Sequence, residues 1–145
     1  MEFYNILLNA HKGIGYLELL LVTLFVIALL GTMFGFSGKV NGFLKKTTLF
    51  TMIFFHVQFL AGLALLFVSP GVKAAMSSGT LMSDAYSRFQ YVEHPVSMLI
   101  AAILMTVVHK KVKTNPTLSL GIVIMGLIAV GLFALAFPWT RVFGA

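Results

Sequence analysis

Two histidines lie inside stretches of sequence that are otherwise apolar. His56 stands in FFHVQFLAG, residues 54–62, and His94 stands in YVEHPVSML, residues 91–99. Ionisable side chains in such segments are rare and are candidates for function. An imidazole nitrogen is a strong ligand for haem iron and for other metals, so metal or haem binding is the first chemistry to consider.

The depth of each histidine can be counted from the nearest lysine, at about 1.5 Å per helical residue. His56 follows Lys46 by ten residues and His94 precedes Lys110 by sixteen, which puts them about 15 and 24 Å from the lysine side. With about 8 to 10 Å between facing helices, their backbones would be roughly 12 Å apart. Two axial imidazoles on one haem iron need about that separation. The depths are therefore compatible with a haem between His56 and His94; hydrogen bonding across helices, with no cofactor, is the alternative.

The residues near this pair would suit a large flat ligand. Gly62 and Gln58 follow the first histidine, and Met98 and Ala101 follow the second. Small or pliable side chains make room for a porphyrin, and they equally make room for another helix. Gln58 is either a contact of the cofactor or a hydrogen-bond partner within the bundle.

A second polar group precedes the first apolar stretch. His11 and Glu18 are seven residues apart and therefore share a helical face. Together with His94 they form a less favoured alternative, a divalent metal site at the outer face. The simpler interpretation of Glu18 is a carboxylate near the membrane interface.

The residues beside His94 limit how its imidazole is presented. Pro95 restricts the preceding residue to extended backbone or marks a kink. Glu93 either orients a ligand histidine or forms an ion pair with Arg88.

The composition indicates the elements that must position these residues. Of the 145 residues, 59% are hydrophobic and 10% are charged, which is far outside the range of a soluble domain. Four apolar stretches have about the 20 residues that a helix needs to cross a hydrocarbon core, and they lack the alternation of a barrel strand. We predict an all-α membrane protein, a four-transmembrane-helix bundle forming one domain over residues 1–145. Its helices are expected at about 16–36, 47–68, 89–108 and 117–137, with an outer loop at 69–88.

Six lysines set the expected orientation of the bundle. They fall in two loops that contain no acid, and they are Lys39, Lys45, Lys46, Lys110, Lys111 and Lys113. By the positive-inside rule these loops face the cytoplasm, so both termini are predicted to be periplasmic. The other four basic residues balance the four acidic ones. The net charge of +6 is explained by topology and by contact with anionic lipid, and it indicates no nucleic-acid partner.

Several segments resemble small four-helix membrane proteins of bacteria, common in the Bacteroidetes, that are called cytochrome b-like. The similar segments are HVQFLAGLALLFVSP, EHPVSMLIAAILMTVVHKK and FPW. More distantly, the arrangement is similar to one half of a haem A synthase. The resemblance implies haem b and electron transfer, and it extends to His11, His56, Gln58, Gly62, Ser69, Pro70, His94, Pro95, Pro138 and Trp139. Glu18 and the segment after His11 depart from the pattern.

These observations lead to one functional prediction and one alternative. We predict a multi-pass protein of the bacterial inner membrane that binds one haem b through His56 and His94. Its electrons would pass between the membrane and a periplasmic partner, or within a larger respiratory complex. The alternative is a cofactor-free accessory or assembly subunit that packs against other membrane proteins or against a second copy. The chain contains no cysteine and no hydrolytic motif, so an electron-transfer or accessory subunit is expected more than a stand-alone enzyme.

Overall fold

A computed structural model describes residues 2–143, which are almost entirely helical. The long helices are α1 (Glu2–Gly35), α2 (Gly42–Val68), α5 (His94–Thr114) and α6 (Leu120–Ala136). Shorter helical elements join or follow them: α3 (Pro70–Ser78), α4 (Ala85–Arg88), the π-helical segment η1 (Phe89–Glu93) and α7 (Trp139–Val142). The described part of the chain has no β-strand. The all-α class is therefore confirmed.

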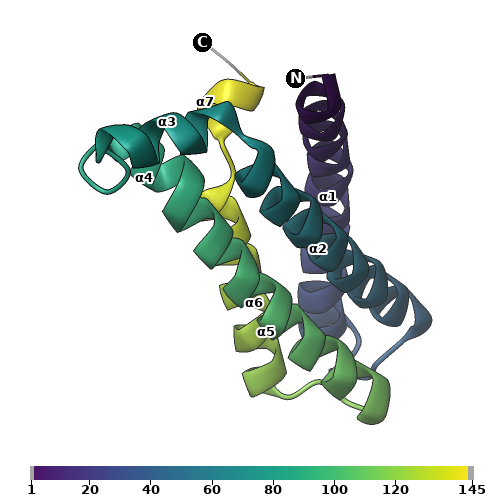
Figure 1. Ribbon diagram of the computed structural model, residues 1–145. Helices are drawn as coiled ribbons and strands as arrows, with labels where there is room; N and C mark the ends of the chain where they lie inside the picture. Colours follow the sequence, from purple (N-terminus) through teal and green to yellow (C-terminus); the bar gives the residue numbers. More distant parts are fainter. Residues whose placement is uncertain (1, 144–145) are drawn as a thin grey trace.

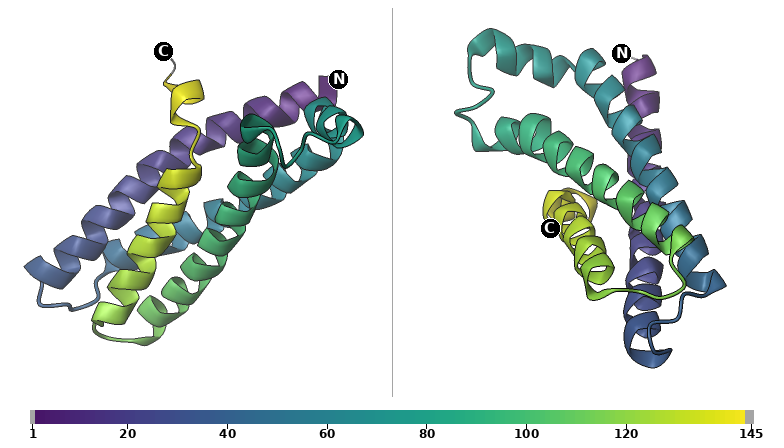
Figure 2. Two further views of the ribbon diagram at one scale, coloured as in Figure 1. Left: turned by 90° about the vertical axis from the view of Figure 1, so that its left-hand side faces the viewer. Right: turned by 90° about the horizontal axis from the view of Figure 1, so that it is seen from below.

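The four long helices form a bundle in which each packs against two others. Helix α1 contacts α2 and α6, and α5 contacts α2 and α6. The chain runs up and down the bundle, so the start of α1 and helix α7 lie at one end (Figure 1). The turns between α1 and α2 and between α5 and α6 lie at the other end, as two further views show (Figure 2).

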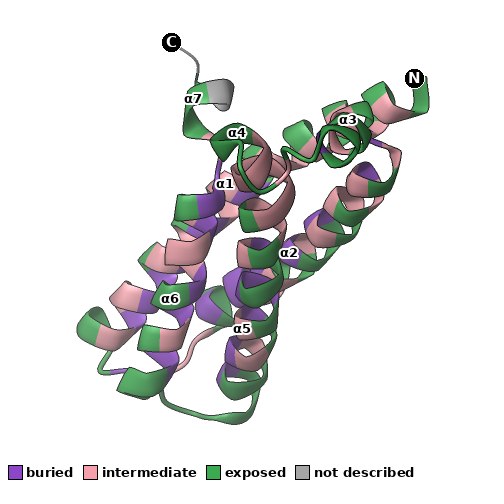
Figure 3. Ribbon diagram, turned by 60° about the vertical axis from the view of Figure 1, so that its left-hand side comes forward, coloured by how far each residue is buried: buried purple, intermediate pink, exposed green. Residues whose placement is uncertain are grey.

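Three helical segments are long and apolar enough to cross a membrane by length and composition. They are Glu2–Gly35, Gly42–Val68 and Ala85–Thr114, while Leu120–Ala136 is a shorter apolar helix. All the long helices have exposed residues along their outer faces (Figure 3). The exposed large apolar side chains include Phe34 at 79%, Phe67 at 75% and Leu135 at 78% exposure. A soluble monomer rarely exposes so much apolar surface. This surface is what a lipid-facing bundle requires.

The two lysine-rich loops meet at one end of the bundle. The backbone N–H of Val40 donates to the carbonyl of Pro116 at 3.0 Å, and that of Leu118 donates to the carbonyl of Gly38 at 2.7 Å. Gly38 adopts a φ of 76°, a left-handed conformation that favours glycine. The six lysines therefore share one end, although residues 42–46 and 110–114 already belong to helices.

The largest differences from the sequence-based helix boundaries lie at the start of α1 and in the segment 69–88. Helix α1 begins at Glu2 and not near residue 16, so His11 lies inside it. The expected outer loop at 69–88 is mostly helical, because it contains α3 and α4. Ser69 and Asp84 cap those helices by accepting hydrogen bonds from Val72 N and Ser87 N. The backbone bond with Ser87 also lowers the pKa of Asp84.

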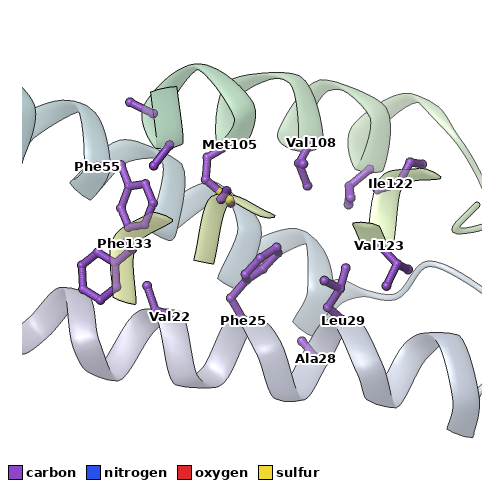
Figure 4. Packing of buried hydrophobic residues seen from close by; sticks show 14 of the residues in the cluster. Val22, Phe25, Ala28, Leu29, Phe55, Met105, Val108, Ile122, Val123 and Phe133 are labelled. Atoms are coloured by element: carbon purple, nitrogen blue, oxygen red, sulfur yellow. The ribbon is translucent and has the colours of Figure 1, made fainter. Parts of the chain in front are cut away.

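The core runs along the middle of the bundle (Figure 4). Phe25, Leu29, Phe55 and Met105 are fully buried there. Phe55 stacks on Phe133 of α6, with ring centroids 5.4 Å apart. This contact lies where the apolar core borders the polar region described in the next section.

Candidate functional site

A cavity of about 390 Å³ lies at the end of the bundle opposite the lysine loops. Its walls come from α1, α2, the η1–α5 segment and α6. The polar residues lining it are Tyr4, His11, Lys12, Tyr16, Glu18, Gln58, Ser69, Gln90, Tyr91 and His94. Small-molecule sites in proteins have volumes of roughly 300 to 1,000 Å³ and combine apolar walls with a few polar groups. The cavity has both properties.

The imidazole of His94 is held by the end of helix α6. Its Nδ1 donates a hydrogen bond to the carbonyl oxygen of Ala136 at 2.7 Å. A carbonyl can only accept, so Nδ1 carries the proton of this hydrogen bond. The carbonyl of Ala136 needs a partner because α6 ends at this residue. Pro138 has no N–H, which leaves the carbonyl of Ala134, four residues earlier, in need of a partner as well. The indole N–H of Trp139 caps Ala134 in the same way, at 2.7 Å.

The backbone at His94 is helical and not extended, which corrects the expectation from Pro95. Its φ and ψ are −61° and −52°. The chain adapts to the proline by forming the π-helical segment Phe89–Glu93 directly before it, with the N–H of His94 donating to the carbonyl of Phe89. Insertions of this kind are frequent at functional sites. Glu93 forms an ion pair with Arg88 at 3.0 Å, so it does not orient His94.

His11 faces His94 across the cavity. The two ring centroids are 6.3 Å apart and the ring planes are nearly perpendicular, at 85°. Gly62 lies against His11, and a Cβ at that glycine would lie 3.4 Å from Cε1 of the imidazole, within ordinary van der Waals contact. The Nδ1 of His11 is buried and forms no hydrogen bond with the described residues.

Gln58 and Glu18 form the wall beside His11. Both side chains are buried, with exposures of 5% and 3%. The Gln58 Nε2 donates to the backbone carbonyl of His11 at 2.8 Å. Gly15 lies beside this amide, and a Cβ there would make ordinary van der Waals contact with Nε2 at 3.7 Å. The Oε1 atoms of Glu18 and Gln58 accept no hydrogen bond from the described residues.

The structure does not bring His56 and His94 together. His56 lies on an exposed face of α2 and outside the cavity. Its Nε2 forms a hydrogen bond of 2.7 Å with Oγ1 of Thr106. Thr106 is twelve residues beyond His94 on α5, or about 18 Å along the helix. The count of depths predicts an offset of about 9 Å, so it underestimates the separation along the bundle. It also omits the direction of each side chain around its helix, and His56 points to an exposed face.

The other residues proposed from the sequence fall in different places. Gly62, Gln58 and Met98 line the cavity. Ala101 is fully buried in the apolar core and lies outside the cavity.

The divalent metal site proposed from His11, Glu18 and His94 is not found. Within residues 2–143, no three histidine, cysteine or carboxylate side chains converge where they could hold a metal ion. Only the two imidazoles face each other. A bare divalent ion, which takes three or more protein ligands, is therefore not supported by this geometry.

Sequence reasoning missed Gly15, Gln90 and Tyr91 as lining residues. Gln90 lies one turn before His94, and Gly15 lies one turn after His11. Positions three or four residues apart share a helical face, so this spacing could have identified them once both histidines were accepted as one site.

The fold and the cavity define a class of protein: a helical bundle with membrane-length apolar helices and a polar, histidine-lined cavity at one end. Comparisons with protein-family models, with curated proteins and with solved structures find no match to this chain. Its function is therefore argued from its own residues.

Proposed function

We propose that this protein binds a haem between His11 and His94 and transfers electrons in a bacterial membrane. The observation that supports the proposal is the relation of the two imidazoles across the cavity. This assignment keeps His94 from the sequence-based pair and replaces His56 by His11.

The spacing of the imidazoles fits a single iron. An imidazole nitrogen binds a metal at about 2.0 to 2.1 Å and lies roughly 1.1 Å from its ring centroid, so two axial imidazoles have centroids about 6.3 Å apart. The centroids of His11 and His94 are 6.3 Å apart. The separation in this protein therefore equals the one that an iron with two axial histidines requires.

The donor set also fits haem better than a bare ion. A porphyrin supplies four nitrogens itself, so the protein has to supply only the axial ligands. His94 is oriented as a ligand, because metal-binding histidines usually donate their second N–H to a carbonyl or carboxylate, and Nδ1 of His94 bonds Ala136.

The chemistry that haem would supply is one-electron transfer. The residues of this chain would hold the axial positions and tune the charge around the site. Phe133, Phe137 and Met98 belong to the apolar part of the cavity wall. Because an apolar wall controls the local dielectric constant, a nearby charge has a larger effect on the redox properties of the site. The electron acceptor or donor would be a periplasmic protein or another subunit of a larger membrane complex.

The spectrum of the purified protein tests the proposal. Expressed with full haem supply and extracted in mild detergent, the chain should show a Soret band and sharp α and β bands on reduction with dithionite. We expect one haem per chain. A colourless preparation that takes up no added haemin would refute the proposal.

We also propose an orientation for the bundle in the membrane. Four passes through the bacterial inner membrane, with the lysine end in the cytoplasm, would place the haem near the periplasmic side. An alkaline phosphatase fused after residue 145 should then be active, and one fused after Lys113 should be inactive. The reverse pattern would contradict the assigned topology.

A second candidate function is a cofactor-free accessory subunit, and one observation favours it. Gly31 and Gly35 lie one turn apart on α1, and a Cβ at either would meet no atom within 4 Å. Open glycines at this spacing allow close approach of another transmembrane helix. A colourless but stably folded protein that co-purifies with one membrane partner would favour this function over haem binding.

A further inference from the structure

Glu18 is a buried carboxyl group that haem ligation leaves without a role. It lies on α1 with 3% of its surface exposed, and its Oε1 accepts no hydrogen bond from the described residues. Buried charges in proteins are normally paired, and none of the salt bridges in the described part of the chain includes this residue. A carboxyl in such a place is suited to holding and releasing a proton.

The groups that face Glu18 are few. Besides Glu18 itself, the titratable residues lining the cavity are Tyr4, His11, Lys12, Tyr16, Tyr91 and His94. Helix α2 contributes the neutral amide of Gln58, and α6 contributes only apolar side chains. Among the described residues that line the cavity, Glu18 is thus the sole acid.

We propose that Glu18 takes up a proton when the haem site gains an electron, so that electron transfer through this protein is coupled to proton transfer. This inference rests on the proposed function. It adds an activity to the site, and it assigns that activity to a residue two helical turns from His11 and outside the pair of ligands.

The coupling follows from the distance between the two charges. Glu18 lies seven residues beyond His11, or about 10 Å along the helix axis. At an effective dielectric constant of about 20, one added charge at that distance changes the proton affinity of a carboxylate on the order of tenfold. The reduced site therefore binds the proton more tightly than the oxidised site.

The step adds one electron to the site and one proton to each Glu18 carboxylate that is ionised, which averages to about half a proton per electron for a tenfold change in affinity. An external one-electron donor supplies the electron, and the Glu18 carboxylate gains one proton from water as the electron enters the site. One O–H bond forms at Glu18. Protons can reach it from the cavity mouth, where Lys12 and Tyr16 are exposed. Reoxidation returns the proton by the same route.

A redox titration at several pH values tests the inference. With dithionite and mediator dyes, the midpoint potential of the wild-type haem protein should fall as pH rises. A tenfold difference in proton affinity corresponds to a fall of about 59 mV in total for a one-electron couple. In the Glu18→Gln variant, the part of this pH dependence that comes from Glu18 should disappear. Any contribution from the carboxylates of haem itself remains in both proteins and cancels in the comparison.

Two further variants separate coupling from a merely structural role. Glu93→Gln removes the exposed carboxylate paired with Arg88 and should keep the wild-type pH dependence. Glu18→Asp should restore it in part. Identical pH curves for wild type and Glu18→Gln would overturn the inference while leaving haem binding intact, whereas a colourless wild-type protein would overturn both.

A direct measurement covers the case in which Glu18→Gln does not take up haem. In weakly buffered detergent solution, an indicator dye should report up to about half a proton taken up per electron on reduction of the wild-type protein, as linkage requires for a tenfold change in affinity. Reduction without proton uptake between pH 5 and 9 would overturn the inference.

Discussion

Replacing His94 or His11 by alanine is expected to abolish the haem spectrum, while His56→Ala is expected to keep it. The two cavity histidines face each other with centroids 6.3 Å apart, whereas His56 bonds to Thr106 on an outer face. Loss of an axial ligand removes a direct bond to iron. Even loss of a residue that only supports a metal ligand typically costs 10- to 100-fold in affinity, so we expect a larger effect here. The measurement is haem content per chain, with the Soret band as readout.

His56→Ala is the matched control, since it removes an intramembrane histidine of the same type. A protein that loses its Soret band on His56→Ala and keeps it on His11→Ala would restore the pairing first expected from the sequence. Gel filtration of each variant in detergent should show that the bundle remains folded. Unchanged spectra in both His11→Ala and His94→Ala would contradict the assigned ligands.

Replacing Gly126 by leucine is expected to destabilise the bundle strongly. A Cβ at this glycine would lie 3.0 Å from Cδ2 of Leu29 and 3.2 Å from Cζ of Phe25. Both of those side chains have 0% exposure, so they have no free space into which to move. Overpacking of a well-filled core typically costs about 1 to 3 kcal/mol. The change should appear as a lower midpoint of thermal unfolding in detergent.

Gly131 on the same helix provides the control for this prediction. Its Cβ position has no atom within 4 Å, so Gly131→Leu should change stability by no more than about 0.5 kcal/mol. Equal destabilisation by the two substitutions would contradict the observed packing of α6 against α1. A haem-binding measurement on both variants would show whether close packing of α6 also supports the site.

The comparison of these two glycines illustrates what a sequence pattern can and cannot resolve. Gly121, Gly126 and Gly131 recur every five residues, a spacing that does not follow one helical face. The pattern alone does not distinguish the glycine that accommodates a neighbouring helix from the ones that face outward. Only the position of α6 against α1 separates Gly126 from Gly131.

In the candidate site, too, the sequence identified some lining residues and could not identify others. The sequence singled out His94, Gln58, Gly62 and Met98, and all four line one cavity. It also selected Ala101, which belongs to the core. The segment before residue 16 is less apolar than a membrane-spanning segment, so the sequence predicts that His11 lies ahead of the first helix. The sequence therefore pairs His94 with His56 and not with His11. Helix α1 in fact starts at Glu2.

By itself the sequence determined the helical class, the approximate positions of the long apolar helices and the grouping of six lysines around two loops. These properties are set by composition and local pattern, because apolar runs, caps and charges act within a few residues of chain. The tertiary structure decided which histidine faces which. That choice depends on how far each helix is rotated about its own axis against its neighbours, and packing between distant segments sets the rotation. His56 and His11 have the same side chain, and only the packing of the helices directs His11 toward His94.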